Sequence, residues 1–106
     1  MGLLEFLRGP DMDAGVAQCR QTPGAVLLDV RTPEEYRGGH IPGSRNLPLD
    51  ALQGVTDAVP DKGTPLFVYC RSGARSGQAV RLLGQMGYTR VTNIGGIMQY
   101  HGKVER

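Results

Sequence analysis

The chain has 106 residues, of which 40% are apolar and 21% charged, and its formal net charge is +2. This length suits a single core, so residues 1–106 are expected to form one domain. The small net charge and the lack of a lysine- or arginine-rich run argue against nucleic acid as a partner. No apolar stretch is long enough for a secretory signal or a membrane span, so we expect a cytoplasmic protein without membrane association.

The N-terminal part predicts a helix followed by a buried strand. Residues 12–21 carry a weak helical pattern, with Asp11 or Asp13 as the N-cap. Residues 26–28, with Val30, form a continuous apolar run that is typical of a strand buried on both faces. A parallel sheet covered by helices produces such runs.

The middle of the chain predicts shorter elements. Residues 33–36 fit a short helix with Thr32 as the N-cap, a proline at the first position and acidic residues in the first turn. Residues 45–47 are a weaker strand candidate, and residues 49–55 are a further helix candidate.

The C-terminal half predicts a strand, a helix and another strand. Residues 66–69 are a second continuous apolar run, and residues 91–94 are a further strand candidate. Between them, residues 76–86 place their apolar side chains on one stripe, and Gly87 is a plausible C-terminal stop. Strands that alternate with helices in this way predict an open, mostly parallel α/β sheet.

The segment after the second buried strand holds the strongest chemical candidate. Cys70 ends this strand and is followed by Arg71, Ser72, Gly73, Ala74, Arg75 and Ser76. A tight turn into a helix can point several backbone N–H groups at one anion, and the helix N-terminus adds about half a positive charge. Such surroundings lower the pKa of a thiol, and the thiolate is the nucleophilic form. We therefore expect Cys70 to be an anionic nucleophile that solvent can reach; a cysteine that merely packs at a strand end is the alternative.

Three separate segments resemble rhodanese-homology domains. The loop Cys70-Arg71-Ser72-Gly73-Ala74-Arg75-Ser76 resembles the active-site loop of that family. The segment LDVRTPEEY at residues 28–36, followed by GHIPGS at 39–44 and NLP at 46–48, is similar to a second signature. NIGGI at residues 93–97 is similar to a third. The family often has tryptophan four residues after the glycine pair, where this chain has Tyr100.

This resemblance implies a five-stranded, mostly parallel sheet in three α/β/α layers. It also implies an enzyme, a thiosulfate sulfurtransferase that moves sulfane sulfur from thiosulfate or a persulfide to cyanide or a thiol. The sulfur is carried as a persulfide on Cys70, and the two steps make a ping-pong mechanism. Residues 71–75 and Ser76 form the cradle that binds small sulfur anions. No metal and no organic cofactor are implied.

Two other functions remain open at this stage. One is a relay or interaction module that passes sulfur between protein partners, since it needs the same persulfide. The other is a cysteine phosphatase or arsenate reductase, which also uses a strand-loop-helix thiolate cradle. The phosphatase signature has arginine six positions after the cysteine, where this chain has Ser76. A sulfur centre is therefore the better-matched substrate.

Several other residues could be read as functional. Asp29 and Arg31 follow a strand and either act directly or brace the loops through a salt bridge. His40 lies in a glycine-rich turn and is expected to fix that turn, whereas His101 is expected to be solvated. Cys19 is expected to be an ordinary half-buried side chain, with a resolving thiol as the alternative.

Overall fold

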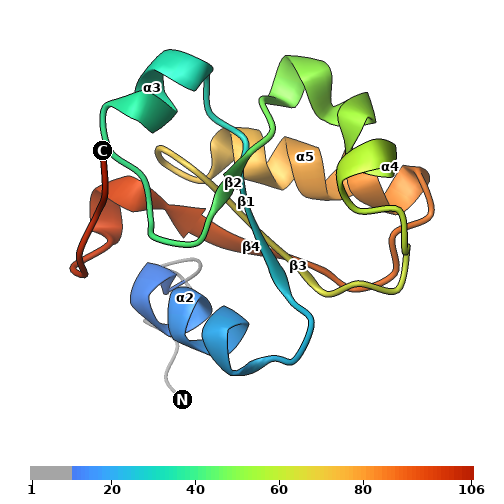
Figure 1. Ribbon diagram of the computed structural model, residues 1–106, viewed down its shortest axis with the longest axis horizontal. Helices are drawn as coiled ribbons and strands as arrows, with labels where there is room; N and C mark the ends of the chain where they lie inside the picture. The colour runs from blue at the N-terminus through green and yellow to red at the C-terminus, as the bar shows by residue number, and fades with distance from the viewer. Residues whose placement is uncertain (1–10) are drawn as a thin grey trace.

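The computed structural model describes residues 11–106, which form a sheet with helices on both faces (Figure 1). In chain order the elements are α2 (Met12–Gln21), β1 (Val26–Asp29), α3 (Pro33–Arg37), β2 (Arg45–Asn46), η1 (Leu49–Gly54), α4 (Val55–Ala58), β3 (Leu66–Cys70), α5 (Ala74–Gln85), β4 (Val91–Gly96) and η2 (Ile97–Gln99). The predicted α/β class is confirmed. No helix in this range is long and apolar enough to cross a membrane.

The sheet has the strand order β2-β1-β3-β4, and every neighbouring pair is parallel. The prediction of five strands is wrong for residues 11–106, where the sheet has four. The sequence runs account for those four, and the fifth came from the family resemblance alone. The C-terminal segment of the described chain forms an isolated antiparallel bridge between Glu105 and His40. His40 lies in a loop, so this bridge does not extend the sheet.

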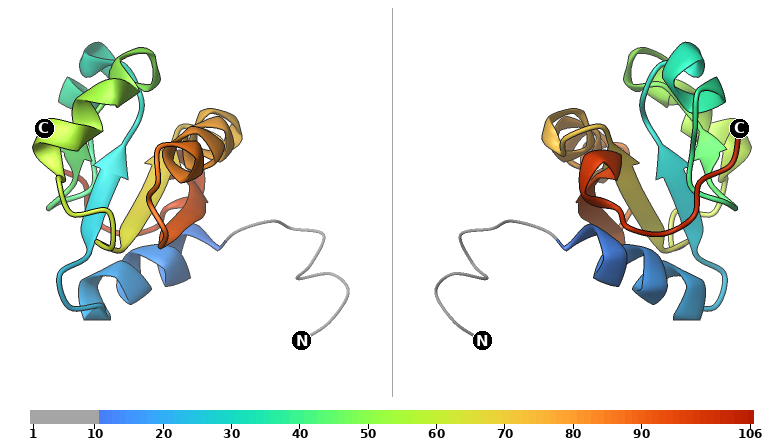
Figure 2. Two further views of the ribbon diagram at one scale, coloured as in Figure 1. Left: turned by 90° about the vertical axis from the view of Figure 1, so that its right-hand side faces the viewer. Right: turned by 90° about the vertical axis from the view of Figure 1, so that its left-hand side faces the viewer.

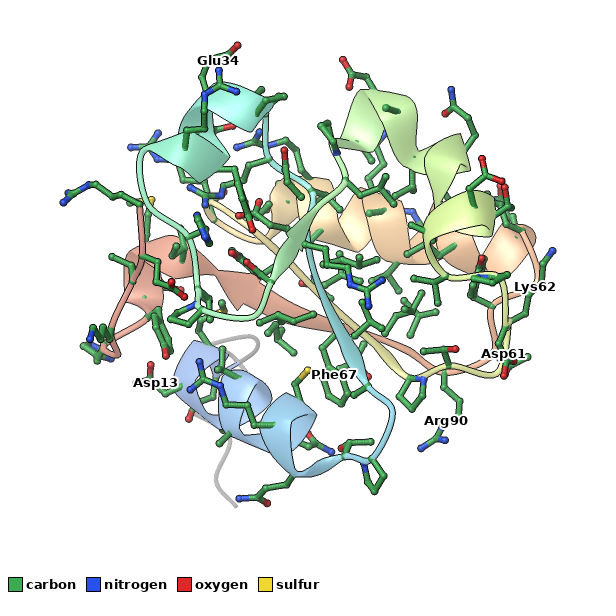
Figure 3. The ribbon with its side chains drawn as sticks, viewed as in Figure 1. Asp13, Glu34, Asp61, Lys62, Phe67 and Arg90 are labelled. Atoms are coloured by element: carbon green, nitrogen blue, oxygen red, sulfur yellow. The ribbon has the colours of Figure 1, made fainter. Side chains whose placement is uncertain are left out.

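The sheet separates two apolar cores because successive side chains of a strand point to opposite faces. Along β3, Leu66, Val68 and Cys70 belong to the core under α5, α4 and η1. Phe67 and Tyr69 belong to the core under α2, and Figure 3 shows Phe67 on the α2 side. Figure 2 shows α2 on the side of the sheet opposite α5. Burial on both faces explains why the strand reads as a continuous apolar run.

The helix ends follow their capping residues. Asp11, rather than Asp13, caps α2, since its carboxylate accepts a hydrogen bond from the N–H of Ala14 at 3.2 Å. Thr32 caps α3 in a capping box with Glu35, as the sequence predicts for Thr32. The helix expected over residues 49–55 is instead a 3₁₀ segment followed by one short α-helix.

The start of α5 fixes the geometry of the loop after β3. The helix begins at Ala74, two residues before the predicted start at Ser76. Gly73, at its N-cap, has φ of +104°, a left-handed conformation that side-chain-bearing residues rarely adopt. The chain therefore turns from strand to helix within three residues of Cys70.

Candidate active site

Cys70 lies at the carboxyl end of a central strand, where β3 passes into α5. Its side chain points towards α5, and the backbone N–H of Gly73 donates a hydrogen bond to Sγ at 3.0 Å. The left-handed Gly73 turns this N–H inward. The sulfur therefore lies at the N-terminal end of α5, where the helix dipole favours negative charge.

A hydroxyl group completes the immediate surroundings of the sulfur. Ser76 is fully buried, and its Oγ lies 3.4 Å from the Sγ of Cys70. Burial by itself would raise the pKa of Cys70. Hydrogen bonds from the Ser76 hydroxyl and from the backbone N–H groups of Ser76, Gly73 and Ser72 outweigh burial, and the pKa of the thiol lies below its usual value.

The exposure of the thiol differs from the sequence-based expectation. Cys70 is only 1% exposed, whereas an open nucleophile was expected. The reason is that the side chain points into the core shared with α5 rather than out of the loop. A sulfur donor can reach Sγ only if side chains or the loop above it move aside.

The two arginines of the loop have different surroundings. The guanidinium of Arg75 donates hydrogen bonds to both carboxylate oxygens of Glu35 on α3, at 2.7 and 2.9 Å. Arg71 is exposed and forms no ion pair within residues 11–106. Arg71 is therefore the loop cation that can approach a bound anion without first breaking an ion pair.

The outer side of the loop packs closely against the end of β4. A Cβ added to Gly96 would collide with the carbonyl oxygen of Arg71 and lie 2.6 Å from the Cα of Ser72. The N–H of Met98 donates to the carbonyl of Arg71 at 3.2 Å. The glycine pair of the third sequence segment thus lets β4 approach the Cys70 loop.

Asp29 and Arg31 form a buried ion pair beside the site. Asp29 is 0% exposed and accepts from the Arg31 guanidinium at 2.6 to 3.1 Å. Arg31 also donates to the carbonyl of Gly39 at 2.8 Å. Asn46 donates to the backbone carbonyls of both Asp29 and Arg31, which ties the end of β1 to β2. These contacts brace the loops, and none reaches the Cys70 sulfur.

The remaining candidates lie away from the thiol or serve the fold. His40 stacks on Tyr36 at 3.8 Å between ring centroids and contacts its carbonyl through Nδ1 at 2.9 Å, which fixes the turn. His101 is exposed but pairs with Asp13 at 2.7 Å, so it is not simply solvated. Cys19 on α2 is buried rather than half-buried as expected, because it packs in the core between α2 and the sheet, and burial raises its pKa. Its core is on the opposite face of the sheet from that of Cys70.

A groove of about 420 Å³ opens beside the loop on the α5 face. Its lining is largely apolar and consists of Val30, Thr32, Pro48, Leu49, Asp50, Arg75, Gln78 and Leu82. Val30 belongs to the same core as Cys70, and Leu49 packs against that core. The groove therefore adjoins the thiol's surroundings, although Cys70 does not line it.

One residue of the site was not singled out from the sequence. Asn93, in the middle of β4, accepts a hydrogen bond from the Ser76 hydroxyl at 2.7 Å and contacts the loop carbonyl of Gly73 at 3.3 Å. It lies in the third segment quoted for the resemblance. That segment was therefore the available signal, but a contact between β4 and α5 cannot be inferred from it.

Comparison with known proteins places the chain among sulfur-transferring proteins. The rhodanese-like domain family matches residues 14–103. Thiosulfate sulfurtransferase PspE of Escherichia coli is 46% identical over 71 residues, which cover 66% of this chain and 68% of that protein. Thiosulfate:glutathione sulfurtransferase of Saccharomyces cerevisiae is 35% identical over 91 residues, covering 74% and 66%. A solved rhodanese from Escherichia coli, described with anions, has a TM-score of 0.73 and 40% identity, covering 77% of this chain and 98% of that one.

Proposed function

Since this chain belongs to the rhodanese-like domain family, we propose that it is a thiosulfate sulfurtransferase that carries sulfane sulfur on Cys70. Its relatives include proteins named thiosulfate sulfurtransferases, which supports sulfur transfer as the general activity. The observation that carries the proposal is the cradle around one sulfur, with the Gly73 N–H at 3.0 Å from Sγ at the start of α5.

In the first step the Cys70 thiolate attacks the outer sulfur of thiosulfate. A new S–S bond forms, the S–S bond of thiosulfate breaks, and its electron pair leaves with sulfite. The product is a persulfide on Cys70 whose terminal sulfur is anionic. The helix N-terminus and the inward N–H groups stabilise this negative charge as they do that of the thiolate.

In the second step a nucleophilic acceptor attacks the terminal sulfur. The acceptor is a cyanide ion or a thiolate, and Cys70 leaves as a thiolate, so the enzyme returns to its starting state without an external reductant. This sequence is double displacement with a covalent intermediate. The name of the yeast relative supports a small thiol as one class of acceptor.

Binding of the anionic donor is assigned to the loop of residues 71–76. The backbone N–H groups of the turn supply positive potential there. Arg71 adds an exposed cation at the loop, while the charge of Arg75 is engaged by Glu35. We expect Arg71→Ala to raise the KM for thiosulfate more than Arg75→Ala does.

The direct test is persulfide formation followed by mass spectrometry. The pure protein incubated with thiosulfate gains the mass of one sulfur atom, and cyanide removes it with release of thiocyanate. Cys70→Ala gains no sulfur, while Cys19→Ala, the matched control, gains it normally. Normal sulfur transfer by Cys70→Ala would overturn the assignment. Failure of the folded native thiol to react with any sulfur donor would show that the buried Cys70 never becomes accessible.

A sulfur relay between proteins is the second candidate function, and one surface feature favours it. Met98 is 63% exposed, and its backbone N–H donates a hydrogen bond to the carbonyl of Arg71 in the Cys70 loop. An exposed apolar side chain at this place suits contact with a protein donor or acceptor. A relay predicts rapid loading from a protein persulfide together with slow thiosulfate:cyanide turnover. Rapid turnover with small molecules alone favours the enzyme.

A cysteine phosphatase or arsenate reductase fits the cradle less well. Position 76, where the phosphatase signature has an arginine, is a buried serine whose hydroxyl contacts Cys70 and Asn93. A neutral hydroxyl supplies no full charge for a phosphoryl or arsenyl group. If the native protein hydrolysed a phosphate ester and Cys70→Ala did not, phosphatase would become the preferred function over sulfur transfer.

A further inference from the structure

The hydroxyl of Ser76 is surrounded by more acceptors than it has hydrogens. Its Oγ lies 2.7 Å from Oδ1 of Asn93, 3.1 Å from the carbonyl oxygen of Gly73, and 3.4 Å from both the carbonyl oxygen of Gly95 and the Sγ of Cys70. A serine hydroxyl carries one hydrogen and two lone pairs. These four groups therefore compete for a single proton, and Asn93 makes the shortest contact.

The orientation of the Asn93 amide is fixed by its other partners. Oδ1 accepts from the N–H of Gly95 at 2.9 Å, and Nδ2 donates to the carbonyl of Gly73 at 3.3 Å. A flipped amide would place Nδ2 against the N–H of Gly95, two donors facing each other. Oδ1 therefore faces Ser76, and because a carbonyl oxygen only accepts, the serine donates to it.

A local irregularity of the sheet brings Asn93 to this position. The pairing of β3 with β4 shifts register so that Val68 lies opposite Asn93 and Tyr69 opposite Gly95. Bulges of this kind redirect side chains and recur beside active sites. Gly95 has φ of +103°, which permits its N–H to close back on Asn93. The bulge thus turns the amide of Asn93 towards α5 and Ser76.

Resting on the proposed function of Cys70, we propose that Asn93 is a positioning residue that makes the Ser76 hydroxyl a two-position switch. While Cys70 is protonated, Ser76 donates to Asn93, and its lone pair accepts the S–H of the thiol. When Cys70 becomes a thiolate, the hydroxyl turns and donates to Sγ, and the bond to Asn93 is lost. Asn93 therefore competes with the thiolate for one proton and restrains the ionisation of Cys70.

The nearby charged groups do not form part of this switch. On α5 and α3, Arg75 is paired with Glu35, and at the end of β1, Asp29 is paired with Arg31. None of these four residues, nor the exposed Arg71 of the loop, is substituted in the variants of this test. A change in the ionisation of Cys70 can then be assigned to the hydroxyl rather than to a changed charge.

The first test is the ionisation constant of Cys70, measured from the pH dependence of alkylation and from thiolate absorbance in a Cys19→Ala background. Asn93→Ala frees the hydroxyl for the thiolate, so the ionisation constant rises about threefold, within the strength of one neutral hydrogen bond. Ser76→Ala lowers the constant. In the Ser76→Ala protein, Asn93→Ala has no further effect, because the proton for which they compete is gone.

A purely structural role for Asn93 predicts the opposite result. A loosened loop would move the Gly73 N–H away from the sulfur, so Asn93→Ala would lower the ionisation constant of Cys70 with or without the Ser76 hydroxyl. That outcome overturns the proposal. Asn46→Ala is the matched control, since Asn46 also braces a loop through two carbonyls but makes no contact with Ser76. It should leave the ionisation constant unchanged.

A second measurement does not depend on whether the Asn93 variant folds. Below the pKa of Cys70, the infrared S–H stretching band of the Cys19→Ala protein should lie at the lower frequency of a thiol that donates a hydrogen bond, and Ser76→Ala should remove this shift. A band at the frequency of a free thiol overturns the proposal. Neither measurement requires sulfur transfer. Sulfur loading, followed separately by mass, therefore distinguishes a failure of this proposal from a failure of the proposed function.

Discussion

Arg75, in the Cys70 loop, is bound through both ends of its guanidinium to the carboxylate of Glu35, 40 residues earlier in the chain. Glu35 also accepts a hydrogen bond from the N–H of Thr32 at 3.0 Å, which completes the cap of α3. This contact joins the candidate active-site loop to the helix that follows β1. Arg75 is therefore already in an ion pair before any anion binds to the loop.

Glu35→Gln should lower the KM for thiosulfate. Glutamine keeps the capping bond to Thr32, because a capping box accepts either residue, but it releases the charge of Arg75. The small energy of a partly exposed ion pair limits the gain to about twofold to fivefold. Steady-state kinetics measure this change. Glu34→Gln is the control, since Glu34 points away from the sheet (Figure 3) and its carboxylate pairs with Arg37 at 3.8 Å rather than with a loop arginine. An unchanged KM in Glu35→Gln would show that Arg75 does not approach the donor.

The ion pair between Arg75 and Glu35 should make the free energy of unfolding depend on pH in acid. Hydrogen bonds from Arg75 lower the pKa of Glu35 from 4.5 to about 2, against a smaller opposing effect of burial. A carboxyl whose pKa falls on folding stabilises the protein above its unfolded pKa and loses this effect as pH falls towards the folded pKa. The stability gap between the native protein and Glu35→Gln should therefore be full above pH 4.5 and shrink towards pH 2. Urea unfolding at several pH values tests it, and a gap independent of pH would contradict it.

The two cysteines should differ in reactivity within one molecule. Although burial opposes it, hydrogen bonds from Ser76 and the loop amides lower the pKa of Cys70, whereas burial raises that of Cys19. The thiolate is the reactive form, so iodoacetamide at neutral pH should label Cys70 first. Peptide mass spectrometry after brief labelling gives the ratio. Both side chains are shielded from solvent, so faster labelling of Cys19 would mean that access, and not ionisation, governs reactivity here.

The strands and the place of Cys70 at the end of one of them were predictable because they depend on local pattern. The strands Val26–Asp29 and Leu66–Cys70 are buried on both faces. Such strands have continuous apolar runs, which the sequence shows directly. Cys70 could be singled out because open parallel sheets bind ligands at the carboxyl ends of their strands, and Cys70 ends one of these strands. The cap at Thr32 follows equally from neighbouring residues.

The features that the sequence did not predict depend on contacts between distant segments. The pairing of Arg75 with Glu35 requires the position of α3 relative to α5. The contact of Asn93 with Ser76 requires a register shift between β3 and β4, which no periodicity reveals. The burial of Cys70 depends on which face of β3 its side chain joins and on how closely α5 covers it.

Asp29→Asn should destabilise the fold without disabling the chemistry. The change leaves the guanidinium of Arg31 buried beside a neutral partner, and breaking a buried pair costs about 3 to 5 kcal/mol. The amide oxygen can still accept hydrogen bonds, which places the expected loss of stability at about 3 kcal/mol. Chemical denaturation measures the loss, and sulfur loading should fall only with the folded fraction. A folded Asp29→Asn protein that takes up no sulfur would give Asp29 a direct role.

Gly96→Ala should damage both the fold and the site. The new methyl group would collide with the carbonyl oxygen of Arg71, in a region where the backbone of β4 touches the Cys70 loop. Overpacking of this kind costs about 1 to 3 kcal/mol. Because relief of the collision moves the loop that holds the sulfur, the rate of sulfur loading should fall about tenfold or more.

Gly84→Ala is the matched control for this substitution. A Cβ at Gly84 meets nothing within 4 Å, and the residue lies on the exposed side of α5. Alanine there should stabilise the helix by about 0.5 to 1 kcal/mol and leave sulfur loading unchanged. Comparison of the Gly84→Ala and Gly96→Ala variants therefore separates the effect of helix propensity from the effect of close packing. If Gly96→Ala loads sulfur at the native rate, the loop tolerates displacement, and the tight contact with β4 is not needed to hold Cys70 in its reactive geometry.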